Sequence, residues 1–405
     1  MKIRTFILGL AALALIGSGA ALAAEDGEGG KRHPSYNLMG RDASRTAADS
    51  PLNPNFVVAD EARMSEGKFW RSGFINETLV GMTLEDVDGD GKNEVVYVSN
   101  RNVYVSRMGA GKMQQLAKYS FDPTDTIVSV DAMSLTGGGG QEIIVSVQND
   151  QGAPASRIFS FSGSELQVLA SNIPWYLRVT GGPGGRFLAG QRGSSSKGDV
   201  YSGQVMRMSF DGSKVKSQGS AGLPSGVDVF NFTLGRIGSG GMQAVAAIRF
   251  PSEHIFLYEG ANRAWESKEE YGGTMNAIRQ PMTAPEEKQR EFLPSRLLIT
   301  DIDRDGQNEL VVAKNDRGGV QFMSNQRAFS GGAIQVFKYA NMSLSPYFRT
   351  RSLPGPAVDY ALGDFFNDGT IQLVTAVVTE QDGGLLKEGR SVIISYELTT
   401  NASAE

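Results

Sequence analysis

The sequence predicts an all-β protein built as a β-propeller. Short apolar runs rich in β-branched residues recur along the chain, among them "EVVYVS", "QEIIVSV", "ELVVAK" and "QLVTAVV". Gly, Asp or Asn bounds each run, and no long helical pattern interrupts the series. An acidic turn precedes several of the runs. Repeats at intervals of roughly 45 to 65 residues are typical of four-stranded propeller blades.

The acidic turn is the clearest repeat. "DVDGDGKNEVVYV" begins at Asp86 and "DIDRDGQNELVVA" begins at Asp301, with the same acids at the proposed ligand positions. Worn copies begin at three further places: Asp364, Asp131 (with a three-residue insertion) and Gly235. A unit from Trp175 keeps only a strand, a glycine turn and a strand. We therefore predict six blades, with seven as the alternative if a long unit contains another.

The two ends of the repeat region match each other. The last unit supplies three strands instead of four. Arg71 stands fifteen residues before Asp86, and Arg349 stands fifteen residues before Asp364. Because Arg349 falls in the outer strand of the fifth unit, the segment around Trp70 should form the outer strand of the sixth blade. This N-terminal strand closing the last blade leaves few free strand edges.

The ends of the chain are expected to lie outside the propeller. Residues 1–23 have the pattern of a signal peptide, with a basic start, an apolar stretch and a small-x-small cleavage signal. Residues 24–55 carry Gly, Pro, Ser and charge without apolar periodicity, as a flexible linker does. The propeller is predicted over residues 56–400 and a tail over 401–405. We expect an exported monomer, periplasmic or secreted.

Composition narrows the choice of partner. The formal net charge is −5, and the sequence has no cluster of Lys and Arg. Nucleic acids and anionic membranes are therefore not expected partners, since binding them needs clustered positive charge. The chain has no cysteine, which excludes a lipid-anchor cysteine and a disulfide framework. No apolar run after the signal peptide is long enough for a transmembrane segment.

The two complete turns have the spacing of a nine-residue calcium loop. In the first turn the proposed ligands are the carboxylates of Asp86, Asp88, Asp90 and Glu94 and the carbonyl of Lys92. In the second they are the carboxylates of Asp301, Asp303, Asp305 and Glu309 and the carbonyl of Gln307. Carboxylate-rich oxygen shells suit Ca²⁺, whereas Mg²⁺ keeps waters and Zn²⁺ prefers nitrogen or sulfur. The alternative is an Asx-rich turn without metal.

The predicted ion holds a turn and does no chemistry, because protein oxygens fill its shell. An EF-hand would need a bidentate acid at the twelfth position, where Tyr97 and Val312 stand, and a helix after the loop. The Asp364 turn has Phe366 at its third position and Gln372 at its ninth, so we predict no metal there. The remaining three units are interpreted as having lost the ligands.

The stretches "LEDVDGDGKNEVV" and "ITDIDRDGQNELVV" resemble the FG-GAP or VCBS repeat. This repeat occurs in integrin-type propellers and in many exported bacterial proteins. The resemblance spans roughly residues 69–398 and is most specific at the two complete turns. It implies a β-propeller, and the whole arrangement is similar to exported bacterial repeat proteins of unassigned function.

Catalytic motifs are scarce. The sequence has no cysteine nucleophile, no G-x-S-x-G, no phosphate loop and no zinc spacing, and its two histidines are His33 in the linker and His254. We therefore expect a non-enzymatic binding or scaffold protein for an envelope protein or polysaccharide. The partner would bind on a propeller face or on the excursion at residues 276–296. The alternative for that excursion is a short surface helix at "PEEKQREF".

The competing function is a secreted polysaccharide hydrolase or lyase that uses carboxylates around the central channel. Converging Asp, Glu, Arg or Tyr side chains in the channel would favour the enzyme. A channel lined by small and apolar residues would favour the binding module.

Overall fold

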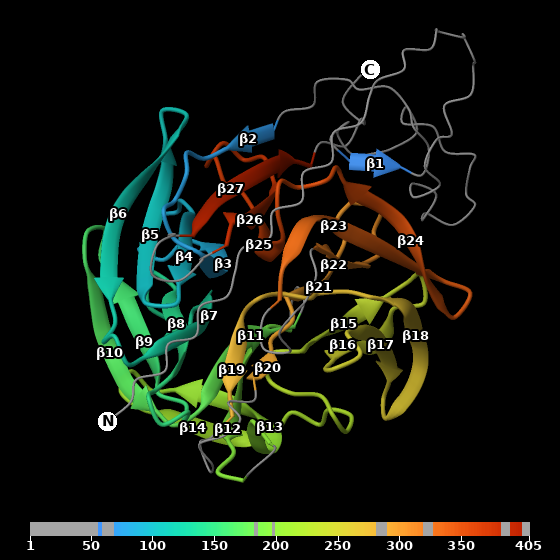
Figure 1. Ribbon diagram of the computed structural model, residues 1–405, viewed down its shortest axis with the longest axis horizontal. Coiled ribbons are helices and arrows are strands. Elements are labelled where there is room, and N and C mark those ends of the chain that lie inside the picture. The colour runs from blue at the N-terminus through green and yellow to red at the C-terminus, as the bar shows by residue number, and fades with distance from the viewer. Residues whose placement is uncertain are drawn as a thin grey trace, which may run out of the picture. The chain divides into compact units, whose positions relative to one another are not determined.

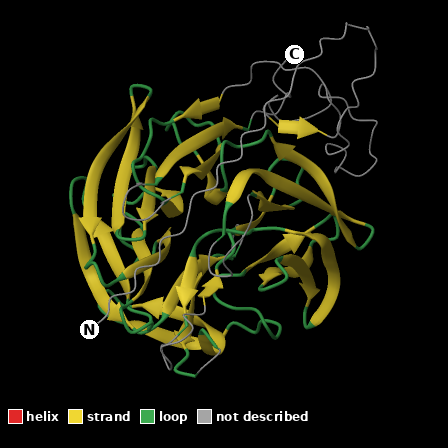
Figure 2. Ribbon diagram, viewed as in Figure 1, coloured by secondary structure: helices red, strands yellow, loops and turns green. Residues whose placement is uncertain are grey.

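The computed structural model describes the following parts of the chain: residues 56–58, 69–181, 185–196, 199–280, 290–318, 327–381 and 389–398. Every regular element in these residues is a β-strand, which confirms the all-β prediction (Figure 2). The strands belong to one compact unit, Leu38–Glu405. The predicted signal peptide, linker and tail lie outside the described residues. In the described part of the chain, no helix is long and apolar enough to cross a membrane.

Six antiparallel sheets follow one another round a ring, each with its first strand nearest the centre (Figure 1). Blades 1 to 3 are β3–β6 (Leu79–Glu85, Glu94–Ser99, Asn102–Gly109, Lys112–Ser120), β7–β10 (Thr126–Met133, Glu142–Gln148, Ser156–Phe161, Leu166–Ile173) and β11–β14 (Tyr176–Thr180, Phe187–Gly193, Tyr201–Phe210, Val215–Ser220). Blades 4 to 6 are β15–β18 (Phe232–Ile237, Met242–Arg249, His254–Glu259, Asn262–Glu270), β21–β24 (Leu297–Thr300, Glu309–Arg317, Phe329–Ala340, Ser343–Thr350) and β25–β27 (Ala357–Gly363, Gln372–Glu380, Arg390–Glu397). The described residues thus form six blades, as predicted, and not seven.

The first two strands of a blade are mostly apolar and buried because neighbouring blades cover both of their faces. β4, with the sequence EVVYVS, is buried at every position. β6, at the rim of the same blade, reads KMQQLAKYS, and most of its side chains are exposed or half-buried. Val98 of blade 1 packs in one cluster with Ile127 and Val145 of blade 2. Continuous β-branched runs therefore mark buried strands, and mixed runs mark rim strands.

Strands from the N-terminal side of the propeller extend two blades. β2 (Phe69–Arg71) pairs with β27 in blade 6, with Trp70 opposite Ser395. Trp70 also packs against Phe365, with ring centroids 5.3 Å apart. The predicted closure of blade 6 is confirmed, and the free edge of β27 is covered. β1 (Phe56–Val58), which was not predicted as a blade strand, adds a fifth strand to blade 5 beside β24.

Two isolated bridges confirm the predicted match between the ends of the repeat region. Ile75 pairs with Ser391 beside blade 6, and Leu353 makes the equivalent pair with Gly332 beside blade 5. Ile75 and Leu353 each stand eleven residues before the acidic turn of the following blade. The same spacing in sequence therefore corresponds to the same place in two blades.

The excursion at residues 276–296 contains a hairpin. β19 (Ala277–Arg279) pairs with β20 (Arg290–Phe292), so the alternative of a surface helix is wrong for these three residues of "PEEKQREF". In the view of Figure 1 the hairpin projects inside the ring, and Ile278 of β19 belongs to the same apolar cluster as Tyr176 of β11. The side chain of Gln148, at the end of β8, bonds the carbonyl of Arg279 at 2.8 Å and its N–H at 3.0 Å. The hairpin between blades 4 and 5 thus reaches across the ring to blade 2.

Candidate functional site

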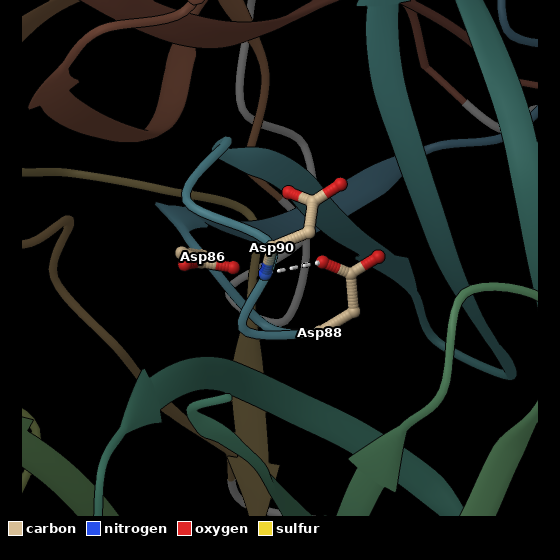
Figure 3. A group of neighbouring side chains, drawn as sticks. All are labelled: Asp86, Asp88 and Asp90. Atoms are coloured by element: carbon tan, nitrogen blue, oxygen red, sulfur yellow. Dashed lines mark hydrogen bonds between the residues drawn. The ribbon is translucent and has the colours of Figure 1, made fainter. Parts of the chain in front are cut away.

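The Asp86 turn is built by hydrogen bonds from its backbone to its first aspartate. Asp86 accepts from the N–H groups of Gly89 at 2.7 Å and Gly91 at 2.9 Å. Gly91 has a φ of 85°, a conformation that favours glycine. Figure 3 shows the carboxylates of Asp86, Asp88 and Asp90 gathered on the turn, with the Asp90 N–H donating to Asp88. The aspartates and glycines of the sequence pattern therefore shape this turn through hydrogen bonds within the chain.

The Asp301 turn repeats this arrangement. Asp301 accepts from the N–H groups of Asp305 at 3.0 Å and Gly306 at 2.8 Å. Its third residue, Asp303, is 4% exposed. In each turn three carboxylates lie within 4.8 Å of one another: Asp86, Asp88 and Asp90 in the first, and Asp301, Asp303 and Glu309 in the second.

The ninth residue of each turn is a buried acid that supports the backbone. Glu94 and Glu309 are both 0% exposed. Glu94 accepts from the N–H of Val87 at 3.0 Å, and Glu309 accepts from the N–H of Ile302 at 3.2 Å. One oxygen of each carboxylate is therefore committed to the turn, whether or not a metal binds.

Blade 2 contains a third version of this turn, and it corrects two predictions. The Leu135 N–H donates to Glu142 at 2.8 Å, the bond seen at Glu94 and Glu309. Counted back from Glu142, the turn has nine residues and begins at Ser134, without an insertion. Asp131, which the sequence alignment placed first in this turn, lies inside β7. The interpretation that this unit has lost every ligand-type residue is also wrong, because Glu142 remains.

The Asp364 turn keeps the backbone bonds without the full set of acids. Asp364 accepts from the N–H groups of Asp368 at 3.0 Å and Gly369 at 2.7 Å. Gln372, at the ninth position, accepts from the N–H of Phe365 at 2.7 Å. An amide therefore replaces the buried carboxylate and accepts the same backbone N–H.

The eighth residue of each complete turn links two blades. Asn93 donates to the carbonyl of Asp364 in blade 6 at 3.1 Å. Asn308 donates to the carbonyl of Arg236 in blade 4 at 2.7 Å. Each asparagine bonds to the preceding blade, so the turns also contribute to the contacts between neighbouring blades.

A cation from the third strand lies against the Asp86 turn. Arg107 on β5 places its guanidinium 2.8 Å from Asp88, 2.8 Å from Asp90 and 2.5 Å from Glu94. Burial raises the pKa of Glu94 to about 7, although the bond from Arg107 lowers it. Three of the four carboxylates in this turn therefore have a positive partner within the chain.

Lys338 occupies the matching place on β23 but makes fewer contacts. Its Nζ pairs with Asp305 and lies 4.0 Å from both Asp303 and Glu309. The second oxygen of Glu309, Oε1, is buried and has no hydrogen-bond partner among the described residues. Burial, and next the charge of Asp303, raises the pKa of Glu309 to about 8. In this turn Lys338 therefore leaves a buried carboxylate oxygen of Glu309 without a hydrogen-bond partner in the described part of the chain.

The donor set of the Asp301 turn fits a hard divalent cation better than that of the Asp86 turn. It offers clustered carboxylates and the buried, unpartnered oxygen of Glu309, and Ca²⁺ is bound by such oxygen sets. In the Asp86 turn an ion would have to displace Arg107. The residues predicted to supply carbonyl ligands, Lys92 and Gln307, each donate an N–H at 2.9 Å to the fifth residue of their own turn. These bonds bend the backbone round the acids.

The centre of the ring holds a buried ion-pair network. The guanidinium of Arg296, just before β21, lies 2.7 Å from Asp131 of blade 2 and 2.9 Å from Asp359 of blade 6. It also donates to the carbonyls of Met82 at 3.2 Å and Val130 at 3.3 Å. Burial lowers the pKa of Arg296, but the two carboxylates outweigh it and the pKa is raised. One side chain thus joins blades 1, 2, 5 and 6.

Both carboxylates of this network are fully engaged. The Asp131 oxygen that Arg296 leaves free accepts the N–H of Val179 at 3.0 Å. Asp359 accepts the N–H of Met82 at 3.1 Å on one oxygen and binds Arg296 with both. A carboxylate that is buried and bonded at both oxygens is poorly placed to exchange a proton with a substrate.

Residues of the network line two cavities. The larger, of about 210 Å³, is lined by residues at the ends of inner strands, among them Glu85 and Thr300. These two residues directly precede the complete acidic turns, so this cavity opens on the same face of the ring. The smaller, of about 20 Å³, is lined by Asn276 and Leu293 beside the β19–β20 hairpin. Arg178 borders both cavities.

Sequence reasoning missed the channel network. Its charged residues interrupt apolar inner strands: Asp131 in "TIVSVDAM", Arg178 in "YLRVT" and Asp359 in "AVDYALG". A charge in a strand that is buried on both faces needs a partner, so each interruption was a signal. The pairing itself was not predictable, since Arg296 and Asp131 are 165 residues apart in sequence.

A ring of six blades with acidic nine-residue turns between first and second strands defines a repeat β-propeller. Residues 86–145 match the family model of the FG-GAP-like repeat, which confirms the resemblance at the Asp86 turn. No curated protein matches the chain.

Two solved structures are similar at low identity. BBS1N in complex with ARL6DN, soaked with mercury, is 11% identical, covers 81% of this chain and 96% of that chain, and gives a TM-score of 0.40. A glucose dehydrogenase is 11% identical, covers 80% of this chain and 99% of that chain, and gives a TM-score of 0.42. Neither structure indicates the function of this chain.

Proposed function

We propose that this chain is an exported, calcium-stabilised β-propeller that acts as a non-enzymatic binding or scaffold module. Its partner is an envelope protein or polysaccharide. The observation that carries the proposal is the engagement of the channel carboxylates: Asp131 and Asp359 are 1% and 2% exposed and bonded at both oxygens. A rigid ring of blades offers its loops and its channel mouth as binding surfaces.

The alternative is a polysaccharide hydrolase or lyase, and one observation favours it. Charged and phenolic side chains converge in the channel: Arg178, Arg296, Asp131, Asp359 and Tyr360. Glycoside hydrolysis needs one carboxyl group that gives a proton and another that attacks or activates water. The two channel aspartates are instead held by Arg296 and by backbone N–H groups. This difference weighs in favour of the binding module.

The histidines add no base to the channel. His254 stands at the start of β17 and lies 3.2 Å from Glu266 on the neighbouring strand. His33 lies outside the described residues. Among the described residues there is therefore no histidine beside the channel network.

Calcium, in this proposal, has a structural role. One ion would be held by Asp301, Asp303, Asp305, Glu309 and the Gln307 carbonyl, and a second by the equivalent residues of the Asp86 turn. The buried oxygen of Glu309 without a partner supports the first site. Each turn joins the first two strands of one blade, so a bound ion would stabilise that connection and not a reacting group.

Export to the periplasm or the cell exterior rests on the sequence of residues 1–23 alone. Cleavage after that segment would give a mature chain that begins at Ala24. Mass spectrometry of the protein recovered from its native envelope fraction tests this point, and an intact Met1 would contradict it.

The function is tested by affinity capture from the cell envelope, with calcium and with chelator, alongside a glycan hydrolysis screen. We expect capture of an envelope protein or polysaccharide and no turnover of any glycan. An Asp88→Ala, Asp303→Ala double variant serves as the calcium-blind control, and its melting temperature should no longer respond to chelator. Turnover of a glycan that is lost in Asp359→Asn would overturn the binding-module proposal.

A further inference from the structure

Arg178 is a buried cation that the channel leaves with unused hydrogen-bond donors. It lies on β11 between two apolar residues, and its side chain is 10% exposed. Its nearest acid is Asp131, with Nε and the carboxylate oxygen 3.6 Å apart, which is longer than a hydrogen bond. Among the described residues the side chain of Arg178 makes no hydrogen bond. Burial, and next the charge of Arg296, lowers its pKa.

Arg296 shows what a satisfied guanidinium looks like in the same channel. It binds two carboxylates and two backbone carbonyls. The oxygen of Asp131 that faces Arg178 already accepts the N–H of Val179. The closest carboxylate oxygen of the network is 3.6 Å from Arg178, beyond hydrogen-bond distance. Donors that border a cavity and lack an acceptor in the chain are free to bond water or a ligand there, and a ligand with a matching acceptor gains affinity from them.

The place for that acceptor is the cavity of about 210 Å³ that Arg178 borders. Hydroxyl groups and aromatic rings line it together: Thr180, Thr233, Thr300, Phe230 and Phe232. Apolar walls with a few polar groups are typical of a small-molecule site. The volume is below the roughly 300–1,000 Å³ of sites for drug-sized ligands, which favours one sugar residue over a peptide segment.

Charge selects the kind of ligand. The guanidinium of Arg binds a carboxylate with two parallel N–H donors, in a geometry that a hydroxyl cannot match. Arg178 and Arg296 balance the charges of Asp131 and Asp359, and Arg186 pairs with Glu85 at the cavity wall. The site therefore tolerates one additional negative charge better than two. A carboxylate therefore suits it better than a doubly charged phosphate.

We infer that the channel cavity beside Arg178 binds the carboxylate of an acidic sugar of uronic-acid type, as a free monosaccharide or as a residue of an acidic polysaccharide. This inference rests on the proposed binding function and specifies its ligand class. Arg178 holds the carboxylate, and the threonine hydroxyls at the cavity wall contact the ring hydroxyls. The aromatic rings of Phe230 and Phe232 contact the apolar face of the sugar.

Isothermal titration of the full chain with galacturonate and glucuronate tests the inference. Galactose and the methyl ester of galacturonate, which lack the charge, and inorganic phosphate are the comparison ligands. We expect at least one uronate to bind, and the uncharged sugars and phosphate to bind about tenfold more weakly or not at all. Oligogalacturonates distinguish a polymer end from a free sugar.

The variant Arg178→Gln should weaken uronate binding by about tenfold or more. Its matched control is Arg192→Gln, which removes the same charge from β12, where Arg192 stacks on Trp175. If Arg178→Gln does not fold, Thr233→Val gives the second measurement and should weaken binding several-fold. Thr233 lines the same cavity.

Two results would overturn the inference: no uronate binds, or Arg178→Gln and Thr233→Val bind uronate as tightly as the parent chain. Envelope capture that persists alongside either result would leave the binding-module function intact. Conversely, uronate binding that depends on Arg178, with no envelope component captured, would support the cavity and contradict the wider function.

Discussion

The Asp86 turn and the Asp301 turn have the same acids at the same positions but different cations beside them. Both fold round a first aspartate that accepts two backbone N–H groups, and both bury a ninth-position glutamate. Arg107 reaches three carboxylates of the first turn within 2.8 Å. Lys338 pairs with one carboxylate of the second turn and stays 4.0 Å from two others.

This comparison shows that the cation which contacts an acidic turn comes from the third strand of the same blade. An arginine has a planar fork with several donors, so it can serve several carboxylates at once. A lysine has one compact charge at the end of a flexible stem. In the Asp86 turn, three of the four carboxylates thus bond to Arg107, whereas the Asp301 turn keeps an unpartnered buried oxygen on Glu309.

The largest effect is expected from removing the arginine. Arg107→Met should destabilise the calcium-free protein by about 3 kcal/mol, because it leaves the buried Glu94 without its cation. Lys338→Met, the matched change in the other turn, should cost clearly less. Urea unfolding in chelator at pH 8 measures both values. Equal losses of unfolding free energy in the two variants would show that Arg107 and Lys338 stabilise their turns equally, which would contradict the proposed difference between the turns.

Calcium should act mainly through the Asp301 turn. An ion at about 100 times its Kd stabilises the folded state by about 2.7 kcal/mol. Asp303→Ala should therefore remove most of the calcium-dependent rise in melting temperature, and Asp88→Ala should remove less of it. Thermal melting with and without calcium gives the answer. A larger loss in Asp88→Ala would reverse the assignment of the stronger site.

Removing the competing cation should raise the affinity for calcium. We expect Lys338→Gln to tighten calcium binding at the Asp301 turn by about tenfold, since one opposing charge is removed near the ion. Arg236→Gln, on the neighbouring blade, removes a charge that does not contact these acids and serves as the control. Calorimetric titration compares the three proteins. Unchanged affinity in Lys338→Gln would mean that the lysine does not compete for the site.

The smallest effect is expected at the Asp364 turn. Its ninth residue is Gln372, and Phe366 stands where a third carboxylate would be needed. Asp368→Asn should therefore leave both the number of bound calcium ions and the calcium response unchanged. Native mass spectrometry counts the ions, and the expected number is two before and after the change. The loss of one ion in this variant would add the Asp364 turn to the calcium sites.

The sequence alone identified the features that depend on local pattern. Continuous β-branched runs identified the buried strands, and the nine-residue spacing identified the two complete acidic turns. The matched positions of Arg71 and Arg349 predicted how the ring closes, and the bridges of Ile75 and Leu353 agree with it. Where the repeat has diverged in sequence, the predicted position of the turn was wrong. Asp131 was assigned to a turn, although the turn of blade 2 begins three residues later, at Ser134.

The tertiary structure decided everything that depends on contacts between distant segments. It placed Arg107 and Lys338 against their turns, and it brought Arg296 to Asp131 across 165 residues of sequence. It also left Arg178 beside a cavity without an acceptor. A repeat pattern specifies each blade because its hydrogen bonds and apolar contacts lie between neighbouring strands. The balance of charge in the turns and the channel is set where different strands and blades meet, and no local pattern carries that information.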